Sequence, residues 1–181
     1  MNPVVAIRRA TAADAGFLLG VRAEPSASRF QPLRAYSLDG LRAVLQQRAH
    51  DPLDRAFGAK VHWVSTCDGT PAGWITLDVT SRSHGIATVG YTVSEAFRRR
   101  GVASGALRSV IAVAFDADFL NLARLEAVAA IGNVASRRVL VKAGFSEEGS
   151  AEKLLIIDGV RVDHVRFGLV RPEGVSERCP C

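Results

Sequence analysis

Hydrophobic residues recur along this chain at two spacings, and segments of the two kinds follow one another. Alternating or continuous apolar residues over short stretches predict strands, whereas apolar residues three and four apart predict helices. The predicted strands cover residues 4–9, 61–67, 73–79, 87–93, 124–130, 154–158 and 160–170. The predicted helices cover residues 11–23, 37–51, 102–115 and 133–143. This order predicts a mixed α/β domain rather than a repeating series of βαβ units.

Turn and capping residues indicate where several of these elements begin and end. Thr11 and Asp14 have the spacing of a capping box at a helix start. Residues 68–71 (Asp-Gly-Thr-Pro) and 158–159 (Asp-Gly) predict hairpin turns. Gly144 is expected to end the last helix. Residues 25–32 begin and end with proline and are predicted to form a loop.

Length and composition predict one globular domain over residues 1–171, followed by a disordered tail over residues 172–181. No apolar run is long enough to cross a membrane, and no secretory signal core follows the basic start, so a cytoplasmic protein without a membrane partner is expected. Three cysteines, Cys67, Cys179 and Cys181, indicate neither a disulfide framework nor a convincing metal site. We therefore expect no bound metal.

The net charge of +5 and the pI of about 9.6 suit an acidic partner or ligand. However, the basic residues are scattered, and no basic segment is interleaved with aromatic residues that would stack on bases. A nucleic-acid partner is therefore not expected.

Residues 96–107 (AFRRRGVASGAL) contain the longest basic run and directly precede a predicted helix. The first turn of a helix has unpaired backbone N–H groups and a partial positive charge, which together attract an anion. Small side chains there let a phosphate approach the backbone. The segment predicts either a phosphate site or an ordinary helix start with a solvated basic turn. Its residues are Arg98, Arg99, Arg100, Gly101, Val102, Ala103 and Ser104.

The motif Arg98-x-x-Gly101-x-Ala103 resembles a signature of the GCN5-related N-acetyltransferases. Residues 133–145, with Asn133, Ser136 and Leu140 at the expected spacing, resemble the second signature of that superfamily. Residues 7–14 are similar to the usual opening of that superfamily. Residues 90–93, 124–127 and 163–165 resemble the branch that includes the ribosomal-protein alanine N-acetyltransferases. The resemblance extends over residues 4–170.

This resemblance implies a central, mostly antiparallel sheet that is splayed open at a cleft for acetyl-CoA. It implies that the pantetheine arm pairs with the strand edge at Tyr91, Thr92 and Val93, and that the pyrophosphate meets the amides of residues 99–104. It also implies that Asn133 binds the pantetheine, with Ser136 nearby. Helix capping is the alternative role of these two residues, and both roles can coexist. Arg137 or Arg138 either approaches a phosphate or is surface charge.

The reaction implied is direct attack of an amine on the thioester, with a backbone N–H near Val93 as oxyanion donor. Many relatives place a tyrosine acid after the leucine of the second signature, where this chain has Val141. Ser136 or a bound water is therefore the expected proton donor. Glu126 is the expected base if it is not purely structural, and Glu95 and His84 are weaker alternatives.

The expected acceptor is a protein N-terminal α-amine or a small-molecule amine. An α-amine has a reference pKa of about 7.7–8.0, against about 10.4 for lysine, so it needs less help from a base. Candidate walls of the acceptor site are Arg29, Phe30, Gln31, Trp63 and Trp74, although both tryptophans are equally suited to the core. A non-catalytic acyl-CoA sensor is the alternative function. Either a monomer or a homodimer fits the sequence.

Overall fold

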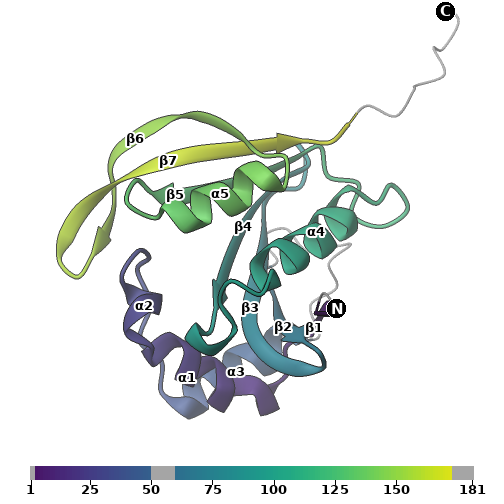
Figure 1. The fold of residues 1–181 in the computed structure, drawn as a ribbon. Helices are drawn as coiled ribbons and strands as arrows, with labels where there is room; N and C mark the ends of the chain where they lie inside the picture. Colours follow the sequence, from purple (N-terminus) through teal and green to yellow (C-terminus); the bar gives the residue numbers. More distant parts are fainter. Residues whose placement is uncertain (1–2, 50–59, 173–181) are drawn as a thin grey trace, which may run out of the picture.

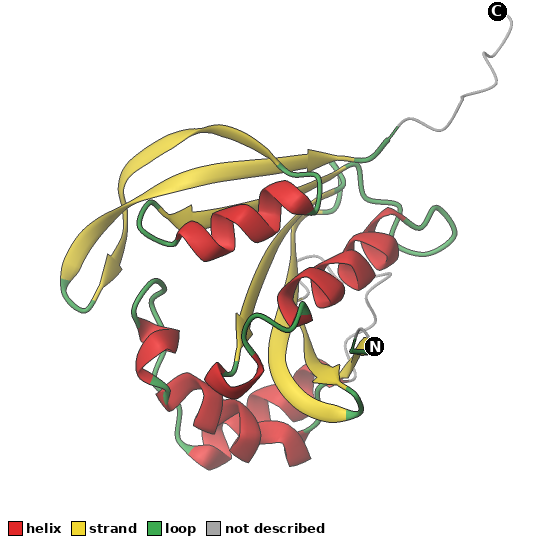
Figure 2. Ribbon diagram, viewed as in Figure 1, coloured by secondary structure: helices red, strands yellow, loops and turns green. Residues whose placement is uncertain are grey.

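The computed structural model describes residues 3–49 and 60–172 and contains a seven-stranded mixed sheet (Figure 1; Figure 2). The order of the strands across the sheet is β1-β2-β3-β4-β5-β7-β6. All neighbours are antiparallel except β4 and β5, which are parallel. The strands are β1 (Val5–Arg9), β2 (Lys60–Cys67), β3 (Thr70–Ser81), β4 (Ile86–Val93), β5 (Arg124–Ala130), β6 (Ser146–Ile157) and β7 (Val160–Val170). The predicted mixed fold is confirmed.

Helices cover both faces of the sheet (Figure 1). On one face α4 packs on β1 to β4, and on the other α1 and α3 contact β3 and β2 respectively. The helices are η1 (Ala12–Asp14), α1 (Ala15–Ala23), α2 (Pro25–Ser28), α3 (Leu38–Ala49), η2 (Glu95–Phe97), α4 (Val102–Phe115) and α5 (Val134–Lys142). Among the described residues, no helix has both the length and the apolar character needed to cross a bilayer.

The alternation of side chains along β2 and β3 separates two cores. Trp63 and Ile75 lie in the main hydrophobic cluster, which also contains residues of α4, whereas Val64 and Trp74 pack with residues of α1 and α3. Because neighbouring residues of a strand point to opposite faces, this division follows from the sequence. Trp63 is therefore a core residue, and its exposed fraction is 6%.

Two predicted boundaries are wrong, each for a physical reason. Residues 25–32 were expected to form a loop, but α2 begins at Pro25, where a missing N–H and a fixed φ suit the first turn of a helix. The predicted strand 154–158 extends back to Ser146, because polar, mostly exposed residues at the edge of the sheet continue the pairing with β7. The expected end of the second helix at residues 51–52 and most of the expected tail lie outside the described residues.

The parallel pair β4–β5 stays together for only part of its length. Three register pairs join the strands, and the last of them is Thr88 with Glu126. Beyond it, residues 89–93 keep their antiparallel partners in β3, while residues 127–130 keep theirs in β7. The sheet is therefore split between β4 and β5, and the backbone edges that face the split have no strand between them.

Candidate functional site

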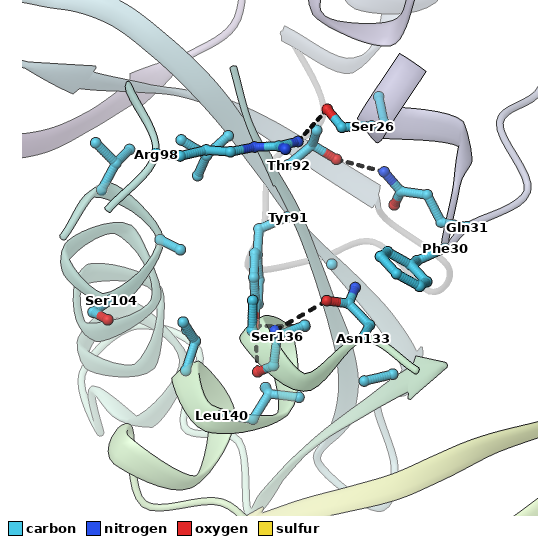
Figure 3. Close-up of a pocket in the computed structure, with 18 of the residues that line it drawn as sticks. Ser26, Phe30, Gln31, Tyr91, Thr92, Arg98, Ser104, Asn133, Ser136 and Leu140 are labelled. Carbon is cyan, nitrogen blue, oxygen red and sulfur yellow. Dashed lines mark hydrogen bonds between the residues drawn. The ribbon is translucent and has the colours of Figure 1, made fainter. Parts of the chain in front are cut away.

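A cavity of about 500 Å³ opens where β4 and β5 diverge (Figure 3). Its walls come from α2 and the residues that follow it, the free half of β4, the start of α4, the divergent half of β5, and α5. The lining includes Ser26, Arg29, Phe30, Gln31, residues 89–93, 97–99, 101–104 and 127–129, Asn133, Ser136 and Leu140. Segments that are far apart in sequence thus meet at the split in the sheet.

The first turn of α4 forms one end of this cavity. Gly101 is the N-cap residue with a φ of +79°, which glycine adopts without strain. The first helical hydrogen bond that closes on Gly101 is from Gly105 N to Gly101 O at 2.9 Å. The preceding amides, those of Val102, Ala103 and Ser104, have no partner within the helix. This end of the cavity therefore offers unpaired N–H donors to an anion.

Glycine is required at positions 101 and 105 for different reasons. A Cβ at Gly101 would meet nothing within 4 Å, so its positive φ is what requires glycine. A Cβ at Gly105 would lie 2.6 Å from Cβ of Val5, so close packing of α4 on β1 requires glycine there. Of the two, only Gly101 lines the cavity.

The three consecutive arginines divide between the cavity and the surface. Arg98 and Arg99 line the cavity, and the guanidinium of Arg98 donates to Ser26 Oγ. Arg100 is not among the lining residues: its Nη2 lies 3.3 Å from Asp68 Oδ2, and its guanidinium stacks on Phe97. The predicted contribution of Arg100 to an anion site therefore lacks support from the geometry.

Tyr91, Ser136 and Asn133 form a hydrogen-bonded group on one wall (Figure 3). The hydroxyl of Tyr91 lies 2.9 Å from Ser136 Oγ and 3.2 Å from the Ser136 carbonyl oxygen. Burial raises the pKa of Tyr91 to about 12, so its hydroxyl keeps its proton at neutral pH. Asn133 Oδ1 accepts from Ser136 N at 3.1 Å, which confirms Asn133 as the N-cap of α5.

Gln31 fixes the opposite wall to the sheet. Its Nε2 donates to Thr92 Oγ1 at 2.6 Å. Tyr91 and Thr92 are neighbours in β4 and so point to opposite faces of the sheet, one toward α5 and the other toward the residues after α2. The cavity thus has polar groups from both faces of the sheet, a connection that periodicity alone does not reveal.

Besides Arg100, three further predicted site residues do not line the cavity. Glu126 lies where β4 and β5 are still paired, and its carboxylate accepts from Arg124 Nε at 2.9 Å. Trp74 packs against the cluster under α1 and α3, with its ring 6.4 Å from that of His62. Arg138 lies in a shallow external groove along α5. Each has a residue type and a sequence position typical of such a site, but its side chain does not face the cavity.

The weaker alternatives for a base also lie outside this lining. His84 is exposed in the turn between β3 and β4, and Glu95 accepts from Ser26 N at 3.3 Å. The hydrogen bond from Ser26 lowers the pKa of Glu95. Neither side chain lines the cavity.

The expectation that a missing acid belongs at Val141 is wrong. Val141 lies on the outer side of α5 with an exposed fraction of 53% and takes part in the external groove. Leu140, one residue earlier, is buried and lines the cavity. A tyrosine at position 141 would point away from the site.

All the charged side chains of the described cavity lining are positive. Among the described residues, its lining has three arginines, Arg29, Arg98 and Arg99, and no aspartate, glutamate or histidine. No group of three or more potential metal ligands occurs in residues 3–49 or 60–172. The site is therefore suited to an anionic ligand.

The split between β4 and β5 leads to the start of α4, where backbone N–H groups are unpaired. This arrangement suits a long ligand with an anionic end. Residues 5–146 match the family model described as the acetyltransferase (GNAT) domain, so the chain belongs to this family.

Two curated relatives and one solved structure illustrate the similarity. YdaF of Bacillus subtilis strain 168, provisionally named a ribosomal N-acetyltransferase, is 34% identical over 111 residues, which cover 61% of this chain and 60% of YdaF. The L-amino acid N-acetyltransferase AaaT of Escherichia coli K12 is 33% identical over 103 residues, which cover 55% of this chain and 62% of AaaT. The chain thus spans about three fifths of the length of these relatives.

The solved structure is RimJ of Mycobacterium smegmatis in complex with CoA-disulfide. It superposes with a TM-score of 0.79 at 24% identity and covers 92% of this chain and 82% of RimJ. At this identity the likeness concerns the fold.

Proposed function

We propose that the protein is an N-acetyltransferase that transfers the acetyl group of acetyl-CoA to a primary amine. The reaction is direct attack within a complex that holds both substrates. The observation that carries the proposal is the continuous cavity from the split between β4 and β5 to the unpaired amides of α4. Membership of the acetyltransferase (GNAT) family supports it.

The residues at the α4 end fit a diphosphate. Backbone amides of Val102, Ala103 and Ser104 supply directional donors, and Arg98 and Arg99 add permanent positive charge. No carboxylate of the described lining opposes them. We assign the diphosphate of acetyl-CoA to this end.

The split in the sheet fits the pantetheine arm. Its two amides can pair with the free backbone edge of β4 at Tyr91, Thr92 and Val93, as an added strand does. Asn133 lines the same space, and its cap uses only Oδ1, so its amide nitrogen remains a donor for the arm. Capping and ligand binding are compatible in this geometry.

The chemical step forms a bond from the amine nitrogen to the carbonyl carbon and breaks the bond from that carbon to sulfur. A backbone N–H near Val93 stabilises the charge on the carbonyl oxygen. The nitrogen loses a proton to water, and the departing thiolate gains one. We assign this proton to Ser136 Oγ, which is hydrogen-bonded to Tyr91. Ser136 regains a proton from water, so the proton that the amine loses balances the proton that the thiolate gains.

An acceptor amine that is already neutral suits this site. The described lining has no carboxylate or imidazole to remove a proton, and an α-amine with a pKa of about 7.7–8.0 is partly neutral near pH 7.5. The two curated relatives are named for a ribosomal and an amino-acid acceptor. We therefore propose an α-amine, of a protein N-terminus or of a small molecule, as the acceptor.

Release of free thiol from acetyl-CoA, measured with a panel of amines and ribosomal proteins, tests this function. Mass spectrometry then identifies the acetylated product. We expect turnover with at least one α-amine, and kcat/KM for that acceptor should rise with pH until the amine is neutral. Tight acetyl-CoA binding without turnover of any amine would support the non-catalytic acyl-CoA sensor instead.

A further inference from the structure

Arg29 is the cavity arginine that the proposed coenzyme site leaves unexplained. Arg98 and Arg99 directly precede the anion-binding turn of α4, whereas Arg29 follows α2 in a different part of the chain. Its guanidinium carbon lies 5.0 Å from the centre of the Phe30 ring. No carboxylate in residues 3–49 or 60–172 forms an ion pair with it. Arg29 is thus an unneutralised cation at the cavity wall.

The segment that holds Arg29 is fixed on both sides. Gln31 is hydrogen-bonded to Thr92 of β4. A Cβ built on Gly132 would lie 3.6 Å from Cε1 of Phe30, so the Phe30 ring lies against the turn between β5 and α5. Figure 3 shows Phe30 and Gln31 on the side of the cavity opposite Ser104. The residues that directly follow Arg29 are therefore fixed to the sheet and to the turn before α5.

Two carboxylates lie near this wall, but both are already engaged. Glu24 accepts from Ser94 Oγ at 2.7 Å and from Glu95 N at 2.8 Å. Glu95 accepts from Ser26 N, and neither carboxylate lines the cavity. A cationic acceptor such as a polyamine would meet arginines at the lining, whose described residues include no carboxylate.

We infer that Arg29 selects an α-amine acceptor that carries a carboxylate a few bonds from the amine, and that it selects against polyamines. The inference rests on the proposed function and deepens it. Guanidinium pairs with a carboxylate through parallel N–H donors, and this pairing would orient the amine toward the split in the sheet. The same positive charge disfavours the ammonium form of a bound amine and so favours its neutral, nucleophilic form.

The carboxylate can belong to a free amino acid or to an acidic residue that follows a peptide N-terminus. Four probes distinguish these sources from each other and from polyamines, which we expect the site to reject. They are glutamate, alanyl-glutamate amide, alanyl-glutamine amide and spermidine. Each is assayed for thiol release from acetyl-CoA, and its binding to the CoA-saturated protein is measured by calorimetry. Acetyl-CoA affinity is measured for every variant.

Arg29→Gln removes the charge, and Arg34→Gln is the matched control. The guanidinium of Arg34 lies 5.6 Å from the centre of the Tyr36 ring, and Arg34 does not line the cavity. We expect the wild-type protein and Arg34→Gln to prefer the glutamate-containing amide to the glutamine-containing amide. We expect Arg29→Gln to lose about threefold to tenfold of kcat/KM for the acidic probe only, the effect of one charge-assisted contact at an exposed site.

Each contrary result has a distinct meaning. Equal use of the two amides, or better use of spermidine by the wild-type protein, would overturn the inference and leave the proposed function standing. Weaker acetyl-CoA binding by Arg29→Gln, with the acceptor preference unchanged, would assign Arg29 to the phosphates and would also overturn it. Absence of acetyl-CoA binding by the wild-type protein would overturn the proposed function itself.

Discussion

Replacing Gly101 with glutamate places a negative charge at the helix start proposed to bind the diphosphate. A Cβ at Gly101 meets nothing within 4 Å, so the new side chain causes no clash at its first atom. The φ of +79° adds backbone strain, which costs about 1–2 kcal/mol for a residue with a side chain. The two consequences, strain and charge, need separate controls.

The charge effect follows from Coulomb's law. A carboxylate about 5 Å from one phosphate charge is repelled by about 1–3 kcal/mol for an effective dielectric constant between roughly 80 and 20. This corresponds to an affinity for acetyl-CoA about 5-fold to 150-fold weaker. Gly101→Gln has nearly the same size and strain but lacks the charge, so it should bind several-fold better than Gly101→Glu.

Calorimetric titration with acetyl-CoA measures the effect, and Gly159→Glu controls for strain. Gly159 has a φ of +80° in the turn between β6 and β7, and its Cβ would also meet nothing within 4 Å. It lies outside the cavity lining. We expect Gly159→Glu to lose stability to a similar extent and to bind acetyl-CoA normally. Undiminished binding by a folded Gly101→Glu variant would refute the location of the diphosphate.

Three further predictions concern the cap, the core and acid stability. Asn133→Ala should raise KM for acetyl-CoA and lower the melting temperature slightly; a large loss of stability with unchanged KM would leave only the capping role. Gly105→Ala should lower the free energy of unfolding by about 1–2 kcal/mol, because its methyl group would lie 2.6 Å from Val5 Cβ, whereas Gly20→Ala in α1 has free space and should stabilise the protein. Burial lowers the pKa of His62 to about 3, so the unfolded chain takes up a proton first as the pH falls below about 6.5. Between pH 6.5 and pH 5 this should remove about 2 kcal/mol of stability in urea unfolding, and His62→Gln should lose correspondingly less over the same range.

The location of the candidate site along the chain was predictable, because its backbone features leave local signals. Basic residues and a glycine before an apolar helical run indicated the start of α4, and Asn133 three residues before Ser136 indicated a helix cap. These features depend on neighbours within a few residues. They therefore survive without knowledge of the tertiary fold.

The directions of individual side chains were not predictable in the same way. Whether Glu126 reaches the cavity depends on where β4 and β5 separate, and a single sequence does not reveal that point. The hydrogen bond between Tyr91 and Ser136 joins residues 45 positions apart. The orientation of Val141 changes by about 100°, more than a quarter of a turn, if the register of α5 is misjudged by one residue. Long-range geometry thus decided which of the expected residues line the cavity.

A crystal structure of the protein grown with acetyl-CoA tests the central claim most directly. We predict that the diphosphate oxygens accept hydrogen bonds from the backbone N–H groups of Val102, Ala103 or Ser104, and that the pantetheine arm lies in the split between β4 and β5. A coenzyme bound elsewhere, with the start of α4 left empty, would contradict the proposed site and the mechanism derived from it.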